Sequence, residues 1–194
     1  MKKRIGLFFG TFNPVHIGHL ILANHLLQYS DLKEIWMVVT PHNPFKKKSS
    51  LLNNQYRYDM VWQLCEEYPG IRPRDIEFHL PQPNYTVTTL AHLEDKYPQY
   101  DFSLIMGEDN LKSFPKWKNY EVILERHHII VYPRYSEGET RPDLLDHPKV
   151  SLINAPRVEI SSTFIRKAIK AGKDVRPLLP PMVWQYIDEM NFYR

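Results

Sequence analysis

Cysteine is nearly absent from this 194-residue chain, which contains only Cys65. One thiol cannot form an intramolecular disulfide, and its isolation excludes zinc and iron–sulfur sites built from several cysteines. Such a chain suits a reducing compartment, so we expect a cytoplasmic protein. The N-terminal residues turn polar after a short apolar stretch, which is too short for a signal peptide or a membrane span, and we expect no membrane partner.

An excess of one charge is also missing, because 25 Lys and Arg stand against 22 Asp and Glu, for a net charge of +3. The runs of like charge are short, three basic residues at 2–4 and three at 46–48. A nucleic-acid-binding module needs a broad basic face, so this balance favours an anionic small molecule and no nucleic acid as the partner. With 43% apolar and 13% aromatic residues and no repeat, we expect one globular domain spanning residues 1–194.

The hydrophobic pattern predicts alternating strands and helices. Residues 5–9 are a wholly apolar run that ends at Gly10, which is typical of a strand buried on both faces at the centre of a sheet. After a turn at 11–14, residues 17–27 carry apolar side chains at helical spacing. We expect further strands at 35–39, 102–106, 128–132 and 150–153, helices at 56–66, 87–96, 120–125, 162–171 and 181–190, and surface loops at 41–55 and 135–148.

Strands separated by helices of about ten residues imply parallel β–α–β units with right-handed crossovers. The expected fold class is therefore α/β, a Rossmann-like doubly wound parallel sheet with helices on both faces. Ligands of such sheets bind beyond the carboxyl ends of the strands. The segments after residues 9, 39, 106 and 153 are thus the places where chemistry is expected.

The most informative segment lies between the first strand and the first helix. Gly10 permits a tight turn there, and the backbone N–H groups around Thr11 and Phe12 can face an anion. A helix that begins near His16 adds its positive N-terminal end. The sequence lacks both the G-x-x-x-x-G-K-[ST] loop and a G-x-G-x-x-G motif after a strand, so neither a P-loop nor a dinucleotide fingerprint explains this segment.

Two histidines of this segment, His16 and His19, are three residues apart, so their imidazoles project from one face of the first helical turn. Gly18 between them has no side chain to obstruct a ligand. An isolated pair of this kind is more often a helix cap with a satisfied polar contact. A zinc site is disfavoured because no Glu follows the first histidine and no third ligand is nearby. The position at a strand-to-helix turn nevertheless favours phosphate binding.

A second constellation, Ile160-Ser161-Ser162-Thr163-Phe164-Ile165-Arg166, opens the next-to-last helix. Ser and Thr are preferred N-cap residues, and the free N–H groups after the cap can bind a phosphate. Arg166 lies about one turn into the helix and can add a forked guanidinium to the same group. An ordinary cap with a solvated Arg would look the same, but the two constellations together describe two helix N-termini that converge on a polyphosphate.

These segments carry a resemblance to a known family. The first resembles the H-x-G-H signature of the nucleotidyltransferase superfamily, and the second resembles its I-S-S-T-x-x-R signature. Together with Asn-Tyr-Thr-Val-Thr-Thr-Leu at 84–90, Gly-Glu-Asp-Asn at 107–110 and Trp117, all in the same order, the chain resembles bacterial nicotinate-nucleotide adenylyltransferases over almost its whole length. The resemblance implies transfer of the adenylyl group of ATP to nicotinate mononucleotide, with Mg²⁺, to give nicotinate adenine dinucleotide and pyrophosphate in NAD biosynthesis.

The resemblance also implies roles for individual residues. His16 and His19 would hold the ATP phosphates, with His19 nearest the α-phosphate, and Arg166 would hold the β- and γ-phosphates with Ser162 and Thr163. The other ATP-binding residues would be Gly10, Thr11, Phe12, Gly18, Lys46, Gly107, Asp109 and Ile160. Lys46 would reach over the phosphates, although it could equally belong to a solvated basic loop with its two neighbours. Asp109 follows a predicted strand, where a carboxylate can accept from ribose hydroxyls, although a plain turn would also use it.

For the nicotinate nucleotide, Trp117 offers a flat face for the pyridine ring, and Tyr85 and Thr86 open a helix whose N-terminal amides would suit the carboxylate. A core Trp and an ordinary helix cap are the competing interpretations. The attacking phosphate is a dianion near neutral pH, its second pKa being about 6, so no protein base is required.

The chain departs from the family at three positions. It has Phe9 where the family has Gly, Asn13 where it has Asp, and Thr88 where Asp is common. Phe9 is expected to narrow the space beside the phosphates. Roles are left unassigned for Asp101, for Cys65 and for the pair His127 and His128.

Two other functions remain open on the sequence. One is another adenylyl- or cytidylyltransferase such as the pantetheine-phosphate enzyme, whose chains are shorter and lack the Tyr-Thr-Val segment followed by Trp. The other is a non-catalytic nucleotide-binding module. A homo-oligomer is compatible with the sequence, which does not decide the oligomeric state.

Overall fold

A computed structural model describes residues 2–41, 51–134 and 142–194. Within them, six parallel strands form one sheet in the order β3-β2-β1-β4-β5-β6. This is the Rossmann strand order, so the expected α/β doubly wound fold is confirmed. The strands are β1 Lys3–Gly10, β2 Glu34–Val39, β3 Ile71–Arg74, β4 Tyr100–Gly107, β5 His128–Tyr132 and β6 Val150–Leu152.

The helices alternate with the strands along the chain. The α-helices are α1 Ile17–Tyr29, α2 Asn54–Glu66, α3 Thr86–Lys96, α4 Glu108–Ser113, α5 Tyr120–Arg126, α6 Pro142–Leu145, α7 Ser162–Lys170 and α8 Pro181–Glu189. Three short 3₁₀ helices lie at η1 Ile76–Phe78, η2 Phe114–Lys116 and η3 Arg176–Leu178. No helix among the described residues is both long and apolar enough to cross a membrane.

The structure differs from the predicted order of elements at three places. β3 was not expected, because it contains one apolar residue, Ile71, and a proline, Pro73; a proline is tolerated there because β3 is an edge strand. The loop predicted at 41–55 ends two residues early, because the Asn53 side chain accepts from the backbone N–H of Gln55 and starts α2 at Asn54. The loop predicted at 135–148 likewise contains the short helix α6.

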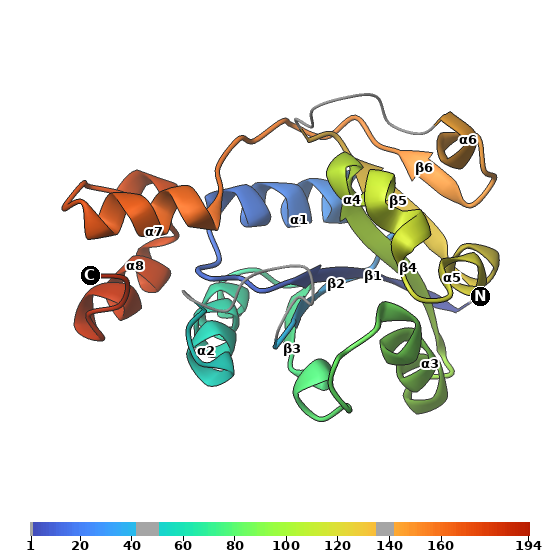
Figure 1. The fold of residues 1–194 in the computed structure, drawn as a ribbon, viewed down its shortest axis with the longest axis horizontal. Coiled ribbons are helices and arrows are strands. Elements are labelled where there is room, and N and C mark those ends of the chain that lie inside the picture. The colour runs from blue at the N-terminus through green and yellow to red at the C-terminus, as the bar shows by residue number, and fades with distance from the viewer. Residues whose placement is uncertain (1, 42–50, 135–141) are drawn as a thin grey trace.

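β1 lies inside the sheet because its apolar run has partners on both sides, with Phe8 paired to Met37 of β2 and to Ile105 of β4. Its side chains alternate between two cores. Phe8 faces a core shared with α1, α2, α7 and α8, whereas Ile5 and Leu7 face a core shared with α3, α4, α5 and α6. Both faces of the sheet are therefore covered by helices, as Figure 1 shows.

The connections at the carboxyl ends of the strands bring distant segments together. The order of the strands reverses between β1 and β4, which is where open α/β sheets bind their ligands. In Figure 1, α7 begins beside the start of α1 and lies with α8 at one end of the molecule, next to the C-terminus. The two helix N-termini that the sequence singled out are thus neighbours.

Candidate active site

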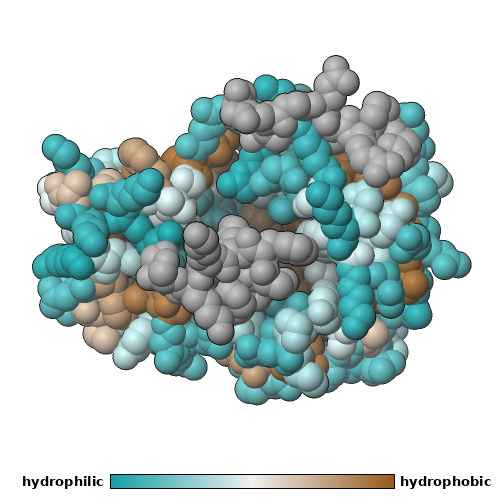
Figure 2. Space-filling model, in the orientation of Figure 1, coloured by the Kyte–Doolittle hydropathy of each residue, from teal (hydrophilic) through white to brown (hydrophobic). Residues whose placement is uncertain are grey.

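A cavity of about 610 Å³ lies beyond the carboxyl ends of the strands. It is lined by the ends of β1 and β5, by Thr40 directly after β2, and by the starts of α1, α3, α4 and α7. Figure 2 shows a hollow near the middle of the molecule, with hydrophilic residues along its upper border. Its volume is in the range of small-molecule sites, and its place at the strand-order reversal is where such sites occur.

The cavity brings together nearly all of the residues that the sequence singled out. Those that line it are Gly10, Thr11, Phe12, His16, Gly18, His19, Tyr85, Thr86, Asp109, Trp117, Ile160, Ser162, Thr163 and Arg166. Gly107 does not line it. Lys46 falls outside the described residues.

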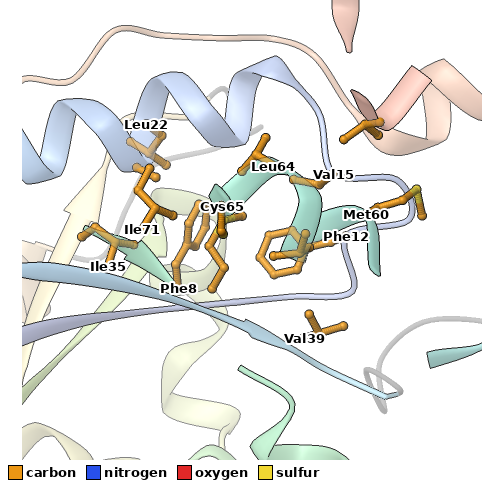
Figure 3. Packing of buried hydrophobic residues seen from close by; sticks show 14 of the residues in the cluster. Phe8, Phe12, Val15, Leu22, Ile35, Val39, Met60, Leu64, Cys65 and Ile71 are labelled. Atoms are coloured by element: carbon orange, nitrogen blue, oxygen red, sulfur yellow. The ribbon is translucent and has the colours of Figure 1, made fainter. Parts of the chain in front are cut away.

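The turn between β1 and α1 combines a residue in the left-handed region with a closely packed glycine. The residue with a left-handed backbone is Phe12, with φ of 43°, and not Gly10. Gly10 is needed for a different reason, because a Cβ there would lie 2.8 Å from two atoms of the Phe12 ring. That ring is buried in the core among Val15, Val39 and Met60 (Figure 3). Core packing therefore holds the unusual turn.

His16 and His19 stack at the start of α1, with ring centroids 3.7 Å apart. The backbone N–H of His16 donates to Nδ1 of His19 at 3.2 Å, so a neutral His19 carries its proton on Nε2. His16 is 5% exposed, and burial, aided by the charge of Arg134, lowers the pKa of His16 to about 4. His16 is therefore a neutral imidazole at physiological pH in the protein without ligand, and in this form it can donate one hydrogen bond to a phosphate.

Gly18 lies against this pair. A Cβ at Gly18 would come within 3.1 Å of the His16 ring and of Val158. The glycine thus permits the close packing of His16, beyond leaving room for a ligand.

The start of α7 is tied to the same turn. Ser161 caps the helix by accepting from the backbone N–H of Phe164. The Ser162 hydroxyl donates to the carbonyl of Pro14 at 2.9 Å, and Arg166 Nη1 donates to the carbonyl of Asn13 at 2.8 Å. These bonds span about 150 residues of sequence and fix the two helix starts relative to one another. The N–H groups of the first turn of each helix then open on one cavity.

Buried polar atoms that lack a hydrogen-bond partner are concentrated in this cavity. Six such side-chain atoms occur among the described residues, and four belong to cavity-lining residues: His16 Nδ1, Glu77 Oε2, Asn84 Oδ1 and Asp109 Oδ1. Unpaired buried polar groups are costly and rare in folded proteins. Their concentration here indicates a site that a polar ligand completes.

The opposite wall combines aromatic and basic side chains. Tyr85 is the N-cap of α3, and the N–H groups of Thr86 and Val87 in its first turn have no acceptor within the helix. Lys118 lies over the Tyr85 ring, with its Nζ 4.4 Å from the ring centroid. The half-buried Trp117 packs edge-on against Phe114 and also lines the cavity, so it is a core residue and a wall residue at once.

Asp109 lies in the first turn of α4 and forms an ion pair with Arg134. The Oδ2 atom of Asp109 is 3.3 Å from Nη1 of Arg134. A Cβ at Gly107 would lie 2.5 Å from Oδ1 of Asp109. Gly107 thus makes room for the carboxylate and contributes no surface of its own.

Several lining residues were missed by the sequence analysis. Arg134 follows β5, a predicted strand, so the rule about strand ends would have found it. Lys118 is adjacent to Trp117, which was an available signal. No sequence signal pointed to Glu77. Its side chain is 2% exposed, its Oε1 accepts from the Thr89 hydroxyl at 2.8 Å, and burial raises its pKa.

Comparisons with known proteins agree with this geometry. Residues 7–168 match the family described as Cytidylyltransferase-like. A protein of Christiangramia forsetii named probable nicotinate-nucleotide adenylyltransferase is 62% identical over 194 residues, covering 100% of both chains. One of the same name from Flavobacterium johnsoniae is 63% identical over 191 residues, covering 98% of this chain and 99% of the relative.

This chain belongs to the nicotinate-nucleotide adenylyltransferase family. A solved structure with the same fold is Plasmodium falciparum nicotinic acid mononucleotide adenylyltransferase complexed with NaAD. It has a TM-score of 0.83 and 24% identity and covers 98% of this chain and 97% of its own. The resemblance to the family stated from the motifs is therefore confirmed.

The three departures from the family pattern have different consequences. Phe9 lines the cavity and packs against the core on the α3 side, so it does occupy space at the site. Thr88 is exposed on α3 and does not line the cavity. Asn13 is buried, and its Oδ1 accepts from the N–H of Leu52 and from the hydroxyl of Tyr193.

Proposed function

We propose that this protein transfers the adenylyl group of ATP to nicotinate mononucleotide, giving nicotinate adenine dinucleotide and pyrophosphate. The observation that carries the proposal is full-length identity of 61–63% to three relatives named probable nicotinate-nucleotide adenylyltransferase. The cavity supports it, because two helix N-termini, a guanidinium and two imidazoles face one space, as a triphosphate requires.

In the proposed reaction, a phosphate oxygen of the mononucleotide forms a bond to the α-phosphorus of ATP while the bond to pyrophosphate breaks. The attacking group is already anionic, so the protein needs to supply position and charge stabilisation and no base. His19, as the Nε2–H tautomer, would donate to the α-phosphate. Arg166, Ser162 and Thr163 would hold the leaving pyrophosphate.

The second substrate would lie on the wall opposite α7. Trp117 would stack on the pyridine ring, and the N–H groups of Thr86 and Val87 would bind the carboxylate. Asp109, in the first turn of α4 directly after β4, would accept from the hydroxyls of the ATP ribose, and Gly107 would only make room for its carboxylate.

We infer that Mg²⁺ enters with the triphosphate. Among the residues that the structure describes, no group of three or more His, Cys, Asp and Glu side chains could hold a metal ion. Mg²⁺ is commonly bound by substrate phosphates together with one or two carboxylates. Two carboxylates line the cavity among the described residues, and Asp109, whose side chain is 38% exposed and pairs with Arg134, is more accessible to such an ion than the buried Glu77.

The test is pyrophosphate release by the purified protein with Mg·ATP and, in separate reactions, nicotinate mononucleotide, nicotinamide mononucleotide and pantetheine phosphate. We expect nicotinate mononucleotide to give the highest kcat/KM. A carboxamide cannot satisfy two N–H donors without placing its NH₂ against one of them, which costs about 1–3 kcal/mol, or roughly ten- to a hundred-fold in specificity. Equal values for the two mononucleotides would refute recognition of the carboxylate at α3, and release only with pantetheine phosphate would refute the proposed substrate.

A further inference from the structure

Arg57 on α2 is a fully buried cation that lies behind the cavity and does not line it. All five of its N–H donors are used, and the acceptors are neutral oxygens 2.6–3.0 Å away: the carbonyls of Thr11, Thr40, Pro41 and Leu52 and the side chain of Asn54. A buried Arg is normally paired with a carboxylate. Burial lowers the pKa of Arg57 to about 10, so the guanidinium stays charged at neutral pH.

The bond to Thr11 bears directly on the phosphate-binding turn. Arg57 Nη1 donates to the Thr11 carbonyl at 2.6 Å, the shortest of the five bonds. The peptide between Thr11 and Phe12 is trans, so the Phe12 N–H points away from the carbonyl and hence away from Arg57. Both residues line the cavity, and this N–H makes no hydrogen bond among the described residues.

A second bond of Arg57 ties this turn to the adjacent strand. Nη1 also donates to the carbonyl of Thr40, which follows β2, at 2.8 Å. Thr40 in turn donates its N–H to the carbonyl of Gly10 at 2.8 Å. Arg57 therefore connects the ends of β1 and β2 at the point where both reach the cavity.

We propose that Arg57 is a positioning residue for adenylyl transfer: it holds the Thr11–Phe12 peptide with its N–H toward the triphosphate and polarises that N–H through the shared peptide bond. The inference rests on the proposed function. A cation bonded to a carbonyl draws electron density from the peptide, which makes the N–H at its other end a stronger donor to an anion. Arg57 thereby acts on ATP through the backbone, without touching it.

The test compares Arg57→Met, which keeps much of the side-chain length without charge, and Arg57→Lys, which keeps the charge. The matched control is His127→Ala. His127 is also buried and bonded to a backbone carbonyl, that of Phe102, but near the other end of β4 from the cavity. For each protein we would measure the unfolding midpoint, kcat and KM for both substrates, and the Kd of α,β-methylene-ATP by calorimetry.

For Arg57→Met we expect kcat/KM for ATP to fall by about tenfold or more and the analogue to bind more weakly, with KM for the mononucleotide changed less than about threefold. The His127→Ala control should lose stability without this selective loss. A buried Lys has a lowered pKa, so the activity of Arg57→Lys relative to the parent should rise as the pH falls from 9 to 6.5. If Arg57→Met does not fold, the pH dependence of the activity of Arg57→Lys still tests whether the charge at this position is needed.

The proposal is overturned if the two substrates lose affinity equally, if the control gives the same kinetic change, or if the relative activity of Arg57→Lys is independent of pH. Failure of the proposed function gives a different result. In that case the unaltered protein releases no pyrophosphate with nicotinate mononucleotide, while binding of the ATP analogue still reports on Arg57.

Discussion

Lowering the pH should destabilise this protein through His16, whose imidazole is buried against His19 and is poorly able to accept a charge. The pKa of His16 is lowered from 6.5 to about 4, chiefly by burial. Between pH 6.5 and pH 4 the unfolded chain therefore binds a proton that the folded protein excludes. The neutral His16 contributes its full stability above pH 6.5 and loses it as the pH falls toward 4, in total about 3 kcal/mol.

The assay is urea denaturation of the parent protein and of His16→Asn between pH 7.5 and pH 4.5. Asn retains a good N-cap side chain for α1 but does not titrate. Other groups titrate in both proteins, so the difference between the two curves isolates His16. We expect the parent to lose about 2.5 kcal/mol relative to the variant between pH 7 and pH 4.5.

Proton NMR of the His16 ring provides the direct check, since its Cε1–H signal should not move above about pH 5.5. Arg134→Gln removes the smaller of the two causes of the shift and should raise the pKa of His16 while leaving it below 6.5. If the two denaturation curves stay parallel within about 0.5 kcal/mol, or if the ring titrates near pH 6.5, the assignment of His16 as a neutral donor is wrong.

Three further changes test the other parts of the cavity. His19→Ala should cut kcat about a hundredfold or more with a nearly unchanged unfolding midpoint, since one donor to the reacting phosphate is lost; near-normal turnover would remove His19 from the site. Arg166→Lys should raise the KM for ATP more than the KM for the mononucleotide, because an ammonium cannot form the two parallel hydrogen bonds that a guanidinium donates to a phosphate. Arg176→Lys, which alters an exposed ion pair, is the control. Gly10→Ala should lower the free energy of unfolding by about 1–3 kcal/mol, because the new methyl would press on the Phe12 ring. An unchanged free energy of unfolding would contradict the close packing of Gly10 against Phe12.

The strands were predictable where a segment of the sequence is apolar at nearly every position. Buried parallel strands need continuous apolar runs, and residues 5–9, 35–39 and 102–106 supply them, so these strands were found to within two residues at each end. β3 could not be found in this way, because it is an edge strand of four residues that needs little apolar surface.

The residues of the cavity were predictable where they lie at an element boundary and carry a recognisable chemistry. His16 and His19 at the start of α1 and Arg166 near the start of α7 met both conditions. The left-handed residue of the turn did not, because Phe12 carries no local signal for a positive φ and its ring is held by the core. The local sequence indicates which residues can adopt a positive φ at low energetic cost, but tertiary packing determines which residue adopts it.

Arg57 shows why the remainder could not be predicted. In the sequence it is one charged residue within a helix, typical of an exposed face. Its environment exists only after residues 11, 40, 41 and 52 have been brought together by the sheet, since these supply the carbonyls that hold it. Asn13 belongs to the same arrangement, because its Oδ1 accepts from the N–H of Leu52 while Arg57 donates to the carbonyl of that residue.

Asn13 stands where the family usually has Asp, and its surroundings suit an amide. Among the described residues, Oδ1 accepts from the Leu52 N–H and the Tyr193 hydroxyl, which are neutral donors that an amide oxygen satisfies without a charge. A carboxylate at this position would place a negative charge close to Arg57 and beside the phosphate-binding turn. With the Asn54 side chain and four backbone carbonyls as its acceptors, the Arg57 guanidinium is solvated by dipoles, so its charge is not cancelled and still acts on an anion in the cavity.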